Sequence, residues 1–457
     1  MKTTDTPVRI GIFGHYGNQN LGDESIIEAV IHNLKTKVPN CEIVCLSIDP
    51  FDSQRRHRTD AFPIRNREEF FERVADPAPV EVSSTIPAVS YSGIRQKHPF
   101  KQRLKSTPLL GTAIRKAIVV RNGLITFGQE IVFLKRAQAC VKSLDLVLVT
   151  GSNQFLDNFG GPFGFPYTLL KWTALAKSNG VKVAFISVGA GPLDHPLSFR
   201  LLKWTLNRAD YVSVRDEGSR TLLKSRTGIE PAVFPDLAHS LTGSTGDTRT
   251  AEPGKRRTVA VNPMPVYDSR YWYTADHDKY SAYIDKLCDL CVAVLEDGHQ
   301  LELFSTQRKD EDVIDDILAR LRNHDQFNQW VQQIQTTRNS EVSGLMETLR
   351  MADIVVATRF HGALLPLQLG VPVLGICYYR KTAELLQDVG LGDYHLDLDN
   401  FSSTALIEKY RLLLKNSDAL SKALESPLKR YRHLLDDQYG AIANLLNPTV
   451  PSRSTRQ

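Results

Sequence analysis

The chain has 457 residues, which exceeds the usual size of a single domain, so we expect two substantial domains. Hydrophobic residues make up 42% and charged residues 23%, a composition that excludes wholesale disorder. The net charge of +5 comes from scattered basic residues that are not interleaved with aromatic ones, so we expect no nucleic-acid partner. No apolar run reaches the roughly 20 uninterrupted residues of a membrane-spanning helix.

The chain begins with MKTTDTPVRIGIFG, a short polar stretch that leads directly into an apolar strand. This start lacks the apolar segment of a secretory signal peptide, so we expect a cytoplasmic protein. Six cysteines are too sparse for a disulfide framework. The CxxC of Cys288 and Cys291 lies in a helical pattern without a second Cys or His pair nearby, so we expect reduced thiols and no metal site.

Residues 1–240 alternate apolar strands with amphipathic helices. The strand VRIGIFG is followed by a polar loop and by SIIEAVIHNLKTKVP, whose apolar residues recur at helical spacing. Further strands are expected at CEIVCLSID, LDLVLVTGSN, VKVAFISVGAGP and YVSVRD. Such a pattern indicates a parallel sheet covered on both faces. We therefore predict an N-terminal Rossmann-like domain over 1–240, interrupted by an insertion at about 52–136.

The locally basic stretch from about 96 to 136 falls largely in this insertion. We expect it to be a solvated helical face, with peripheral contact to the inner membrane surface as the alternative.

A second α/β pattern follows a break at 241–257, where LTGSTGDTRTAEPGKRR loses all apolar periodicity and is typical of a linker. TVAVNPMP, QLELFST, DIVVATRFHG and VPVLGICY predict the strands of another Rossmann-like domain over 258–400. Residues 401–457 are expected to be C-terminal helices and tail. The predicted fold is α/β, with two doubly wound, Rossmann-like domains facing a cleft in a GT-B-like arrangement.

The loop between the first strand and the first helix is rich in glycine and can hold an anion or polar ligand at a helix N-terminus. Its spacing matches neither GxGxxG nor a P-loop, so neither dinucleotide nor ATP is favoured. We expect Gly17, Asn20 and Gly22 to contact substrate. Asp23 either caps the helix or serves as a base for a sugar hydroxyl.

Two further strand ends carry candidate ligand contacts. Gly151, Ser152 and Asn153 follow one apolar strand, and Gly189 and Gly191 follow another. Ligands bind at the carboxyl ends of strands in open α/β sheets. The glycines are explained equally well by turn formation. We expect these strand ends to share one binding crevice.

Four basic residues are candidates for the chemistry of the site. Arg215 ends an apolar strand, where it either binds a carboxylate or phosphate or pairs with Asp216 or Asp236. Arg359 and His361 lie between a buried strand and an apolar helix, so both are expected to project into the crevice. Lys381 is expected to be a third cation of the same pocket or a surface residue.

Together these motifs resemble those of the polysaccharide pyruvyl transferase family. NLGDE, SVGAGP, SVRDEGS, FPDLAHSL and TRFHGALLPLQLGVPVLGICYYRK occur in the family's order and span most of the chain. The resemblance implies a GT-B-like enzyme that transfers the enolpyruvyl group of phosphoenolpyruvate to a sugar as a ketal, releasing phosphate. It also implies that Arg215, Arg359 and His361 hold phosphoenolpyruvate and that His361 is the acid. The first domain is then expected to be the acceptor side and the second the donor side.

The expected acceptor is a sugar of a cell-surface polysaccharide or its lipid-linked oligosaccharide precursor. No metal or redox cofactor is expected, since phosphoenolpyruvate is the donor substrate. Gly151, Ser152 and Asn153 depart from the run of glycines found in many relatives. Two alternative functions remain: a GT-B glycosyltransferase with a nucleotide-sugar donor, and a non-catalytic sugar-binding protein, against which Arg359 and His361 argue.

Overall fold

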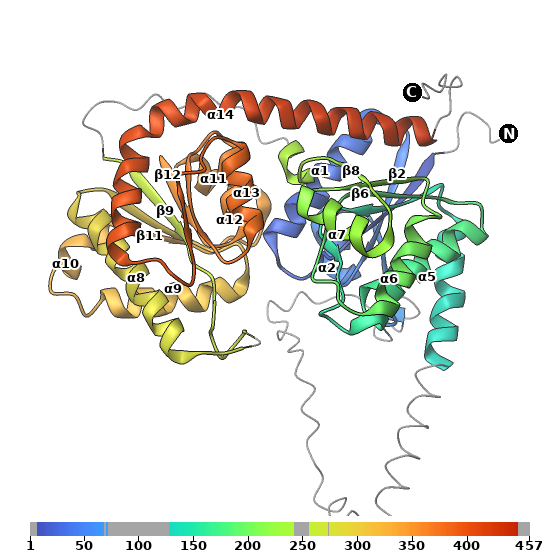
Figure 1. The fold of residues 1–457 in the computed structure, drawn as a ribbon, viewed down its shortest axis with the longest axis horizontal. Helices are drawn as coiled ribbons and strands as arrows, with labels where there is room; N and C mark the ends of the chain where they lie inside the picture. The colour runs from blue at the N-terminus through green and yellow to red at the C-terminus, as the bar shows by residue number, and fades with distance from the viewer. Residues whose placement is uncertain (1–6, 68–69, 72–127, 242–255, 273, 447–457) are drawn as a thin grey trace, which may run out of the picture.

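The computed structural model describes residues 7–67, 70–71, 128–241, 256–272 and 274–446. Two α/β units lie side by side, and a long C-terminal helix runs along both (Figure 1). Most of the predicted linker and most of the predicted insertion lie outside the described residues. No helix in the described ranges is long and apolar enough to cross a membrane.

The first unit is built on a parallel sheet with the strand order β3-β2-β1-β4-β6-β7-β8, with β5 paired to β6. Its strands are β1 (Val8–Phe13), β2 (Cys41–Ser47), β3 (Asp60–Pro63), β4 (Leu146–Thr150), β5 (Asn153–Phe155), β6 (Lys182–Ala190), β7 (Tyr211–Val214) and β8 (Ala232–Val233). The strand order reverses between β1 and β4. This switch point is where doubly wound sheets bind ligands, at the carboxyl ends of their strands.

Helices cover both faces of this sheet. They are α1 (Leu21–Lys37), α2 (Pro50–His57), a helix over 128–142, α5 (Phe165–Ser178), α6 (Pro196–Leu206) and α7 (Glu217–Thr227), with 3₁₀ helices η3 (Gly161–Phe163) and η4 (Leu237–Ser240). In β4, Leu146 and Leu148 join one apolar core, and Val147 and Val149 join the other. Both faces of the strand are therefore buried, which explains its unbroken apolar run.

The second unit repeats the plan with six parallel strands in the order β11-β10-β9-β12-β13-β14. They are β9 (Thr258–Asn262), β10 (Gln300–Phe304), β11 (Ile334–Thr337), β12 (Ile354–Ala357), β13 (Val373–Cys377) and β14 (His395–Asp397). The helices around them are α8 (His277–Glu296), α9 (Arg308–Leu321), α10 (Phe327–Trp330), α11 (Val342–Arg350), α12 (Phe360–Gln368) and α13 (Arg380–Asp388), with the 3₁₀ helix η5 (Val331–Gln333). The switch point lies between β9 and β12.

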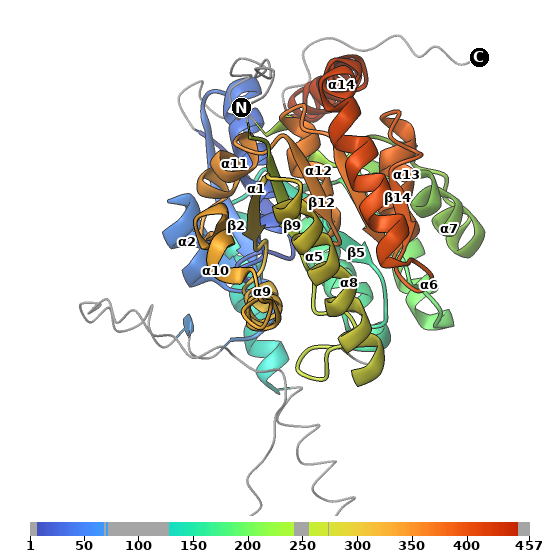
Figure 2. The same ribbon diagram turned by 90° about the vertical axis from the view of Figure 1, so that its left-hand side faces the viewer.

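The last helix, α14 (Ser403–Leu446), joins the two units. Its first part packs against α8 on the flank of the second sheet (Figure 2). Its last part reaches the first unit, where the Gln438 amide donates to Ser213 Oγ at 2.8 Å and the Tyr439 hydroxyl lies 3.2 Å from Ser240 Oγ. One continuous apolar cluster contains residues of both units. The two units are thus packed together as well as connected.

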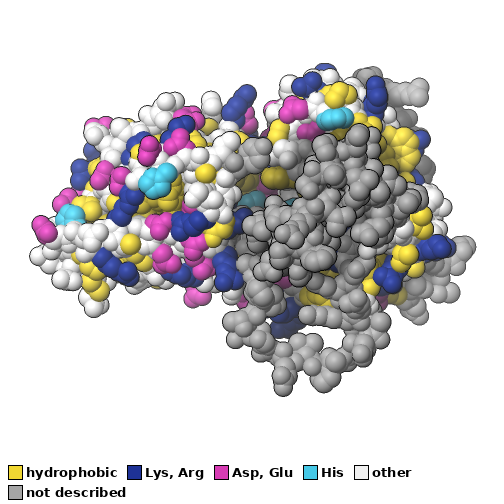
Figure 3. Space-filling view, turned by 90° about the horizontal axis from the view of Figure 1, so that it is seen from below, with side chains coloured by type: hydrophobic (Ala, Val, Ile, Leu, Met, Phe, Trp, Pro, Cys, Tyr) yellow, Lys and Arg dark blue, Asp and Glu magenta, His cyan; other side chains and the backbone are white. Residues whose placement is uncertain are grey.

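Part of the predicted insertion belongs to the first sheet. Residues 52–57 lie in α2, and β3 pairs with β2 in register. At the other end, the helix over 128–142 covers the sheet, and its Arg136 stacks on Phe71. Most of the basic stretch at 96–136 lies outside the described residues. On the lower face of the second unit, basic and acidic side chains are interspersed (Figure 3).

The six cysteines are free thiols. Cys288 and Cys291 lie on α8, where Cys291 packs into the core. Within the described part of the chain, no group of His, Cys, Asp and Glu side chains is arranged to hold a metal ion.

Candidate active site

The carboxyl ends of the two sheets meet at the interface between the units. The loop that follows β1 pairs with the loop that follows β10, through a bridge between Asn20 and Gln307. The Leu21 amide donates to the Thr306 carbonyl at 3.0 Å. A further contact lies deeper, where the Gln368 amide donates to the Ala238 carbonyl. The switch points of both sheets therefore open onto the same region.

His361 lies in this region, in the first turn of α12, and packs directly on Gly22 of α1. A Cβ added to Gly22 would lie 2.5 Å from His361 Cγ and 2.7 Å from His361 Cβ, so no larger residue fits. His361 Nε2 is 3.9 Å from Asp236 Oδ2. That nitrogen is buried and has no hydrogen-bond partner among the described residues. The imidazole is held by packing and by charge.

Arg215 follows β7 and lies on the other side of Asp236. Its Nη1 donates to Asp236 Oδ2 at 3.1 Å and approaches the Gly151 carbonyl at 3.4 Å. Its guanidinium also lies 5.3 Å from the centre of the Phe360 ring. Arg215 Nε is buried, and in the described ranges no atom accepts a hydrogen bond from it. Both predicted ion pairs are thus present, because Arg215 Nε also lies 3.7 Å from Asp216 Oδ2, which is too far for a hydrogen bond.

The charges at this point act on one another. Burial opposes ionisation of Asp236, but the nearby charges of His361 and Arg215 hold its pKa below the ordinary value. Burial lowers the pKa of His361, and Arg215 and Arg359 lower it further, while Asp236 and Asp23 act in the opposite direction. The low pKa favours an ionised Asp236 carboxylate, which faces the Arg215 guanidinium and the His361 imidazole.

Lys381, in the first turn of α13, crosses to the first unit. Its ammonium donates to Asn153 Oδ1 at 2.8 Å. Burial, followed by the charge of Arg215, lowers the pKa of Lys381 to about 7. Asn153 in turn donates to the Gly191 carbonyl at 2.7 Å, which fixes its orientation. Lys381 and Arg215 thus bring two cationic groups from different units to one strand end.

Arg359 is placed differently from the other cations. It precedes α12, and its guanidinium forms a bidentate pair with Asp310 at 2.6 to 2.9 Å. Asp310 is fully buried and also accepts the backbone N–H groups of Thr306 and Gln307. Two of the three nitrogens of Arg359 are therefore engaged inside the second unit. Its role as a donor-substrate contact stays a prediction.

Asp23 lies in the first turn of α1, at the edge of the site. Its Oδ2 accepts from the Asn20 amide at 2.7 Å and is 3.6 Å from His15 Nδ1. Asn20 is the N-cap of α1, because its Oδ1 accepts from the Gly22 amide. The predicted capping role therefore falls to Asn20 rather than to Asp23. Asp23 does not cap the helix, and its carboxylate lies close enough to His361 to influence the pKa of the imidazole.

The remaining predicted contacts differ in what they do. Gly189 has no room for a side chain, because a Cβ there would lie 2.6 Å from Asn153 Oδ1 and 2.8 Å from Arg215 Nε. Ser152 is buried, and its hydroxyl accepts from Gln154. Gly17 has a φ of +78° and lies against the backbone of Asp49. Its conformation and packing explain this glycine without a ligand.

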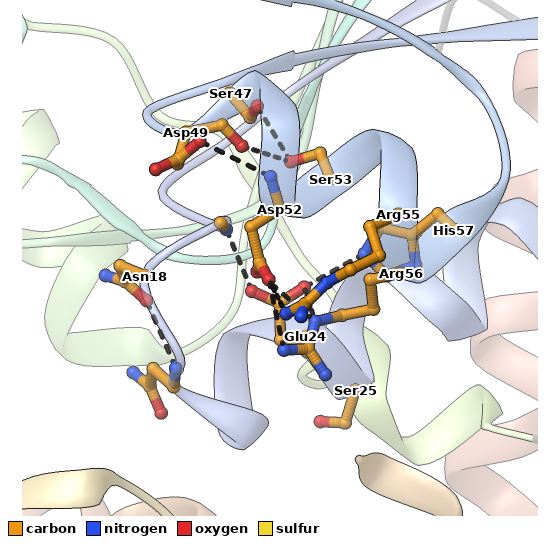
Figure 4. A network of polar contacts seen from close by, with 12 residues as sticks. Asn18, Glu24, Ser25, Ser47, Asp49, Asp52, Ser53, Arg55, Arg56 and His57 are labelled. Atoms are coloured by element: carbon orange, nitrogen blue, oxygen red, sulfur yellow. Dashed lines mark hydrogen bonds and ion pairs between the residues drawn. The ribbon is translucent and has the colours of Figure 1, made fainter. Parts of the chain in front are cut away.

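Glu24, the last residue of the NLGDE motif, organises the base of the loop rather than the site. It is fully buried, and its carboxylate accepts from the Gly17 amide at 2.8 Å and lies 2.9 Å from His57 Nε2 (Figure 4). Arg56 Nε is 3.7 Å from the same carboxylate. The network ties α1 to α2 and so fixes the start of α1, where Gly22 meets His361.

Two carboxylates that organise the site were not among the predicted site residues. Asp236, within FPDLAHSL, was considered only as an ion-pair partner of Arg215, although its place in a shared motif is a usable signal. Asp310 lies in RKDEDVIDDILARL, where it resembles the exposed acidic residues around it. No local pattern distinguishes it from them.

The chain is similar to known proteins in sequence and in fold. A family model described as polysaccharide pyruvyl transferase matches residues 20–379. The amylovoran biosynthesis protein AmsJ of Erwinia amylovora is 20% identical over 445 residues, covering 93% of this chain and 97% of AmsJ. A glycosyltransferase from Rickettsia africae has a TM-score of 0.54 at 8% identity, covering 97% of this chain and 99% of the other. A UDP-GlcNAc 2-epimerase from Neisseria meningitidis, solved with UDP-GlcNAc bound, has a TM-score of 0.51 at 11% identity, covering 96% and 100% of the two chains.

The two solved structures share the fold alone with this chain, and they confirm the predicted α/β fold of GT-B-like type. The family match spans the candidate site, from Asn20 through Arg215 and His361. The chain is an enzyme that belongs to the polysaccharide pyruvyl transferase family.

Proposed function

We propose that the enzyme transfers the enolpyruvyl group of phosphoenolpyruvate to a sugar as a ketal and releases phosphate. The observation that carries this proposal is the buried Nε of Arg215, which lies 3.7 Å from Asp216 Oδ2 but has no hydrogen-bond acceptor in the described structure. A buried donor without an acceptor is costly, which favours a ligand at that position. Lys381 brings a second cationic group to the same strand end. Together they favour an anionic ligand.

Phosphoenolpyruvate matches this pair because it carries a carboxylate and a phosphate close together. A guanidinium donates two parallel N–H groups to such an anion, and an ammonium neutralises it as a point charge. Arg359 is proposed to contribute through the part of its guanidinium that faces away from Asp310. Gly22, Gly151 and Gly189 are proposed to support the donor site indirectly, because protein side chains already occupy the space that a Cβ would fill there.

His361 is proposed to donate a proton to the methylene carbon of phosphoenolpyruvate. The adjacent carbon then becomes an oxocarbenium-like centre that still carries the phosphate. A hydroxyl of the acceptor sugar adds to that carbon, and Asp23 takes the hydroxyl proton. A second hydroxyl of the same sugar then displaces phosphate, which leaves with its bonding electrons and accepts the proton of that hydroxyl, and the ketal ring closes. These reaction steps involve no net change of oxidation state.

The acceptor is proposed to be a sugar of an exopolysaccharide or of its lipid-linked precursor, bound on the first unit near Asp23. The reaction is proposed to take place in the cytoplasm, with peripheral contact to the inner membrane surface where the acceptor is lipid-linked. The similarity to an amylovoran biosynthesis protein supports an acceptor in polysaccharide biosynthesis.

Isothermal titration calorimetry with phosphoenolpyruvate and with UDP-N-acetylglucosamine tests the donor. We expect saturable binding of phosphoenolpyruvate that is weakened by Arg215→Ala, since a charged hydrogen bond contributes about 1.5 to 3 kcal/mol. Arg220→Ala is the matched control, because Arg220 is a half-exposed arginine that pairs with Glu217 on the surface of α7. Binding of the nucleotide sugar without binding of phosphoenolpyruvate would favour a nucleotide-sugar glycosyltransferase and contradict the proposal.

A further inference from the structure

We propose that Asp236 is the positioning residue of the site, whose carboxylate orients Arg215 and favours the protonated form of His361 for proton transfer. The inference rests on the proposed function, because it assigns to His361 the proton that the donor receives. Asp236 itself touches neither proposed substrate, and it acts through the two cationic groups beside it.

The two carboxylate oxygens of Asp236 have different partners. Oδ1 accepts from the Ala238 amide at 3.0 Å, which makes Asp236 the N-cap of η4 and fixes the carboxylate plane. Oδ2 then faces the site, 3.1 Å from Arg215 Nη1 and 3.9 Å from His361 Nε2. One oxygen atom therefore faces both groups. At 4% exposure, Asp236 is shielded from water, so these interactions are only weakly screened.

The charged groups around His361 come from several elements. Asp236 and Asp23 favour its imidazolium, whereas Arg215 and Arg359 disfavour it. Burial also disfavours the charged form, and it is the largest effect. Of the two carboxylates, Asp236 has the larger influence on His361. Removing it therefore leaves the imidazolium with Asp23 as its main counter-charge.

A second histidine nearby does not share this role. His239 lies in η4 and is buried, and burial lowers its pKa to about 4. It is neutral at neutral pH and stacks on Tyr431 with a centroid distance of 4.6 Å. Of the two histidines, His361 is therefore the one assigned to proton transfer.

The arrangement also links the units, since Asp236 belongs to the first and His361 to the second. His361 gains its counter-charge only where α12 packs on the N-terminus of α1 at Gly22. Contact between the units therefore prepares the acid for proton transfer.

Asp236→Asn tests this role, because asparagine keeps the oxygen that caps η4 and removes the charge. The imidazole pKa of His361 would be measured by NMR in the free enzyme, with His361→Gln used to assign the resonance. We expect a lower pKa in Asp236→Asn. An acid must be protonated to act, so the alkaline limb of the rate profile should move to lower pH. A shift of one pKa unit lowers turnover about tenfold on the alkaline side of the profile, and the loss should shrink as the pH is lowered towards the pKa of the variant.

Asp216→Asn is the matched control. Asp216 Oδ2 lies 3.7 Å from the same arginine, and asparagine caps α7 as well as aspartate does. We expect this variant to leave the pKa of His361 and the alkaline limb in place. If Asp236→Asn folds poorly, Asp236→Glu, which keeps the charge, should keep the alkaline limb near its wild-type position, and loss of that limb would overturn the inference.

The NMR readout separates this inference from the proposed function. A lowered pKa of His361 in an enzyme that does not turn over phosphoenolpyruvate supports the pairing and contradicts the donor. Wild-type turnover with an unmoved pKa and an unmoved alkaline limb in Asp236→Asn overturns the role of Asp236 and leaves the donor in place.

Discussion

Replacing Gly22 by alanine tests the contact on which the site is built. Gly22 lies in the first turn of α1, and His361 of the second unit packs directly on its Cα. In an exposed helix, the same substitution stabilises by roughly 0.5 to 1 kcal/mol. Here we expect the opposite sign, because the added methyl group meets the imidazole.

The magnitude follows from the distances. The new Cβ would lie 2.5 Å from His361 Cγ and 2.7 Å from its Cβ, whereas ordinary contacts lie at 3.4–4 Å. Rotation of the ring does not relieve the second contact, so the side chain as a whole must retreat by about 1 Å in a close-packed interface. Overpacking of this kind costs about 1 to 3 kcal/mol. When the stabilisation that alanine brings to a helix is subtracted from this cost, we expect a net loss of roughly 0.5 to 2 kcal/mol in the free energy of unfolding.

The larger effect is on catalysis. A displacement of about 1 Å between a catalytic group and its substrate can lower a rate about a hundredfold. Phosphate release from phosphoenolpyruvate would be measured with a panel of p-nitrophenyl glycosides as acceptors, together with denaturant unfolding. Gly440→Ala is the control, because Gly440 lies in α14 and nothing lies within 4 Å of its added Cβ. We expect that variant to be active and slightly more stable.

Normal turnover of Gly22→Ala with unchanged stability would refute the reasoning. It would mean that the two units separate at this point without loss of function, so that His361 does not need its position against α1.

Three further predictions concern the basic residues. Arg359→Ala should reduce the free energy of unfolding by roughly 3 to 5 kcal/mol in denaturant titrations, besides weakening donor binding, because it leaves Asp310 buried without its counter-charge. A loss below about 1 kcal/mol would show that Asp310 does not depend on it. His361→Gln should keep phosphoenolpyruvate affinity in calorimetry while turnover falls about a hundredfold to ten-thousandfold. Lost binding with unchanged turnover at saturation would make His361 an anion ligand instead. The pKa of Lys381 is lowered to about 7 in the folded protein. Between about pH 7 and the pKa of an unperturbed lysine, the unfolded chain therefore binds more protons than the folded one. As a result, this lysine makes the free energy of unfolding rise with pH over that range. Lys381→Met should remove that rise and gain most over the wild type at about pH 7 and below, and a stability difference that does not change with pH would argue against a lowered pKa of Lys381.

The sequence predicts the elements that bury apolar residues at a regular period. β4 is apolar from Leu146 to Val149 and β6 from Val183 to Ile186 because both faces of these strands are covered, and α1 has its apolar residues at helical spacing. The parallel sheets and the carboxyl-end placement of Arg215 and His361 follow from these patterns. The order of apolar and polar residues within each segment is enough to predict these elements.

Contacts between the units could not be predicted in this way. Gly22 was expected to contact substrate, but nothing in the local sequence shows that its missing side chain makes room for His361. Arg359 was expected to face the ligand, and its bidentate pair with Asp310 joins residues 49 positions apart. Long-range pairs of this kind depend on how packed elements meet, which no local pattern specifies. Asp236 is an intermediate case, because its motif was visible and its function was not.

The central claim is that phosphoenolpyruvate is protonated at its methylene carbon and then captured by a sugar. The most direct measurement is the reaction of the enzyme with phosphoenolpyruvate and the p-nitrophenyl glycoside panel in deuterium oxide, followed by mass spectrometry and NMR of the products. The account predicts phosphate release together with a glycoside that carries a pyruvyl ketal whose methyl group contains one deuterium, and loss of both in His361→Gln. A ketal without deuterium in its methyl group, or transfer from UDP-N-acetylglucosamine but not from phosphoenolpyruvate, would contradict it.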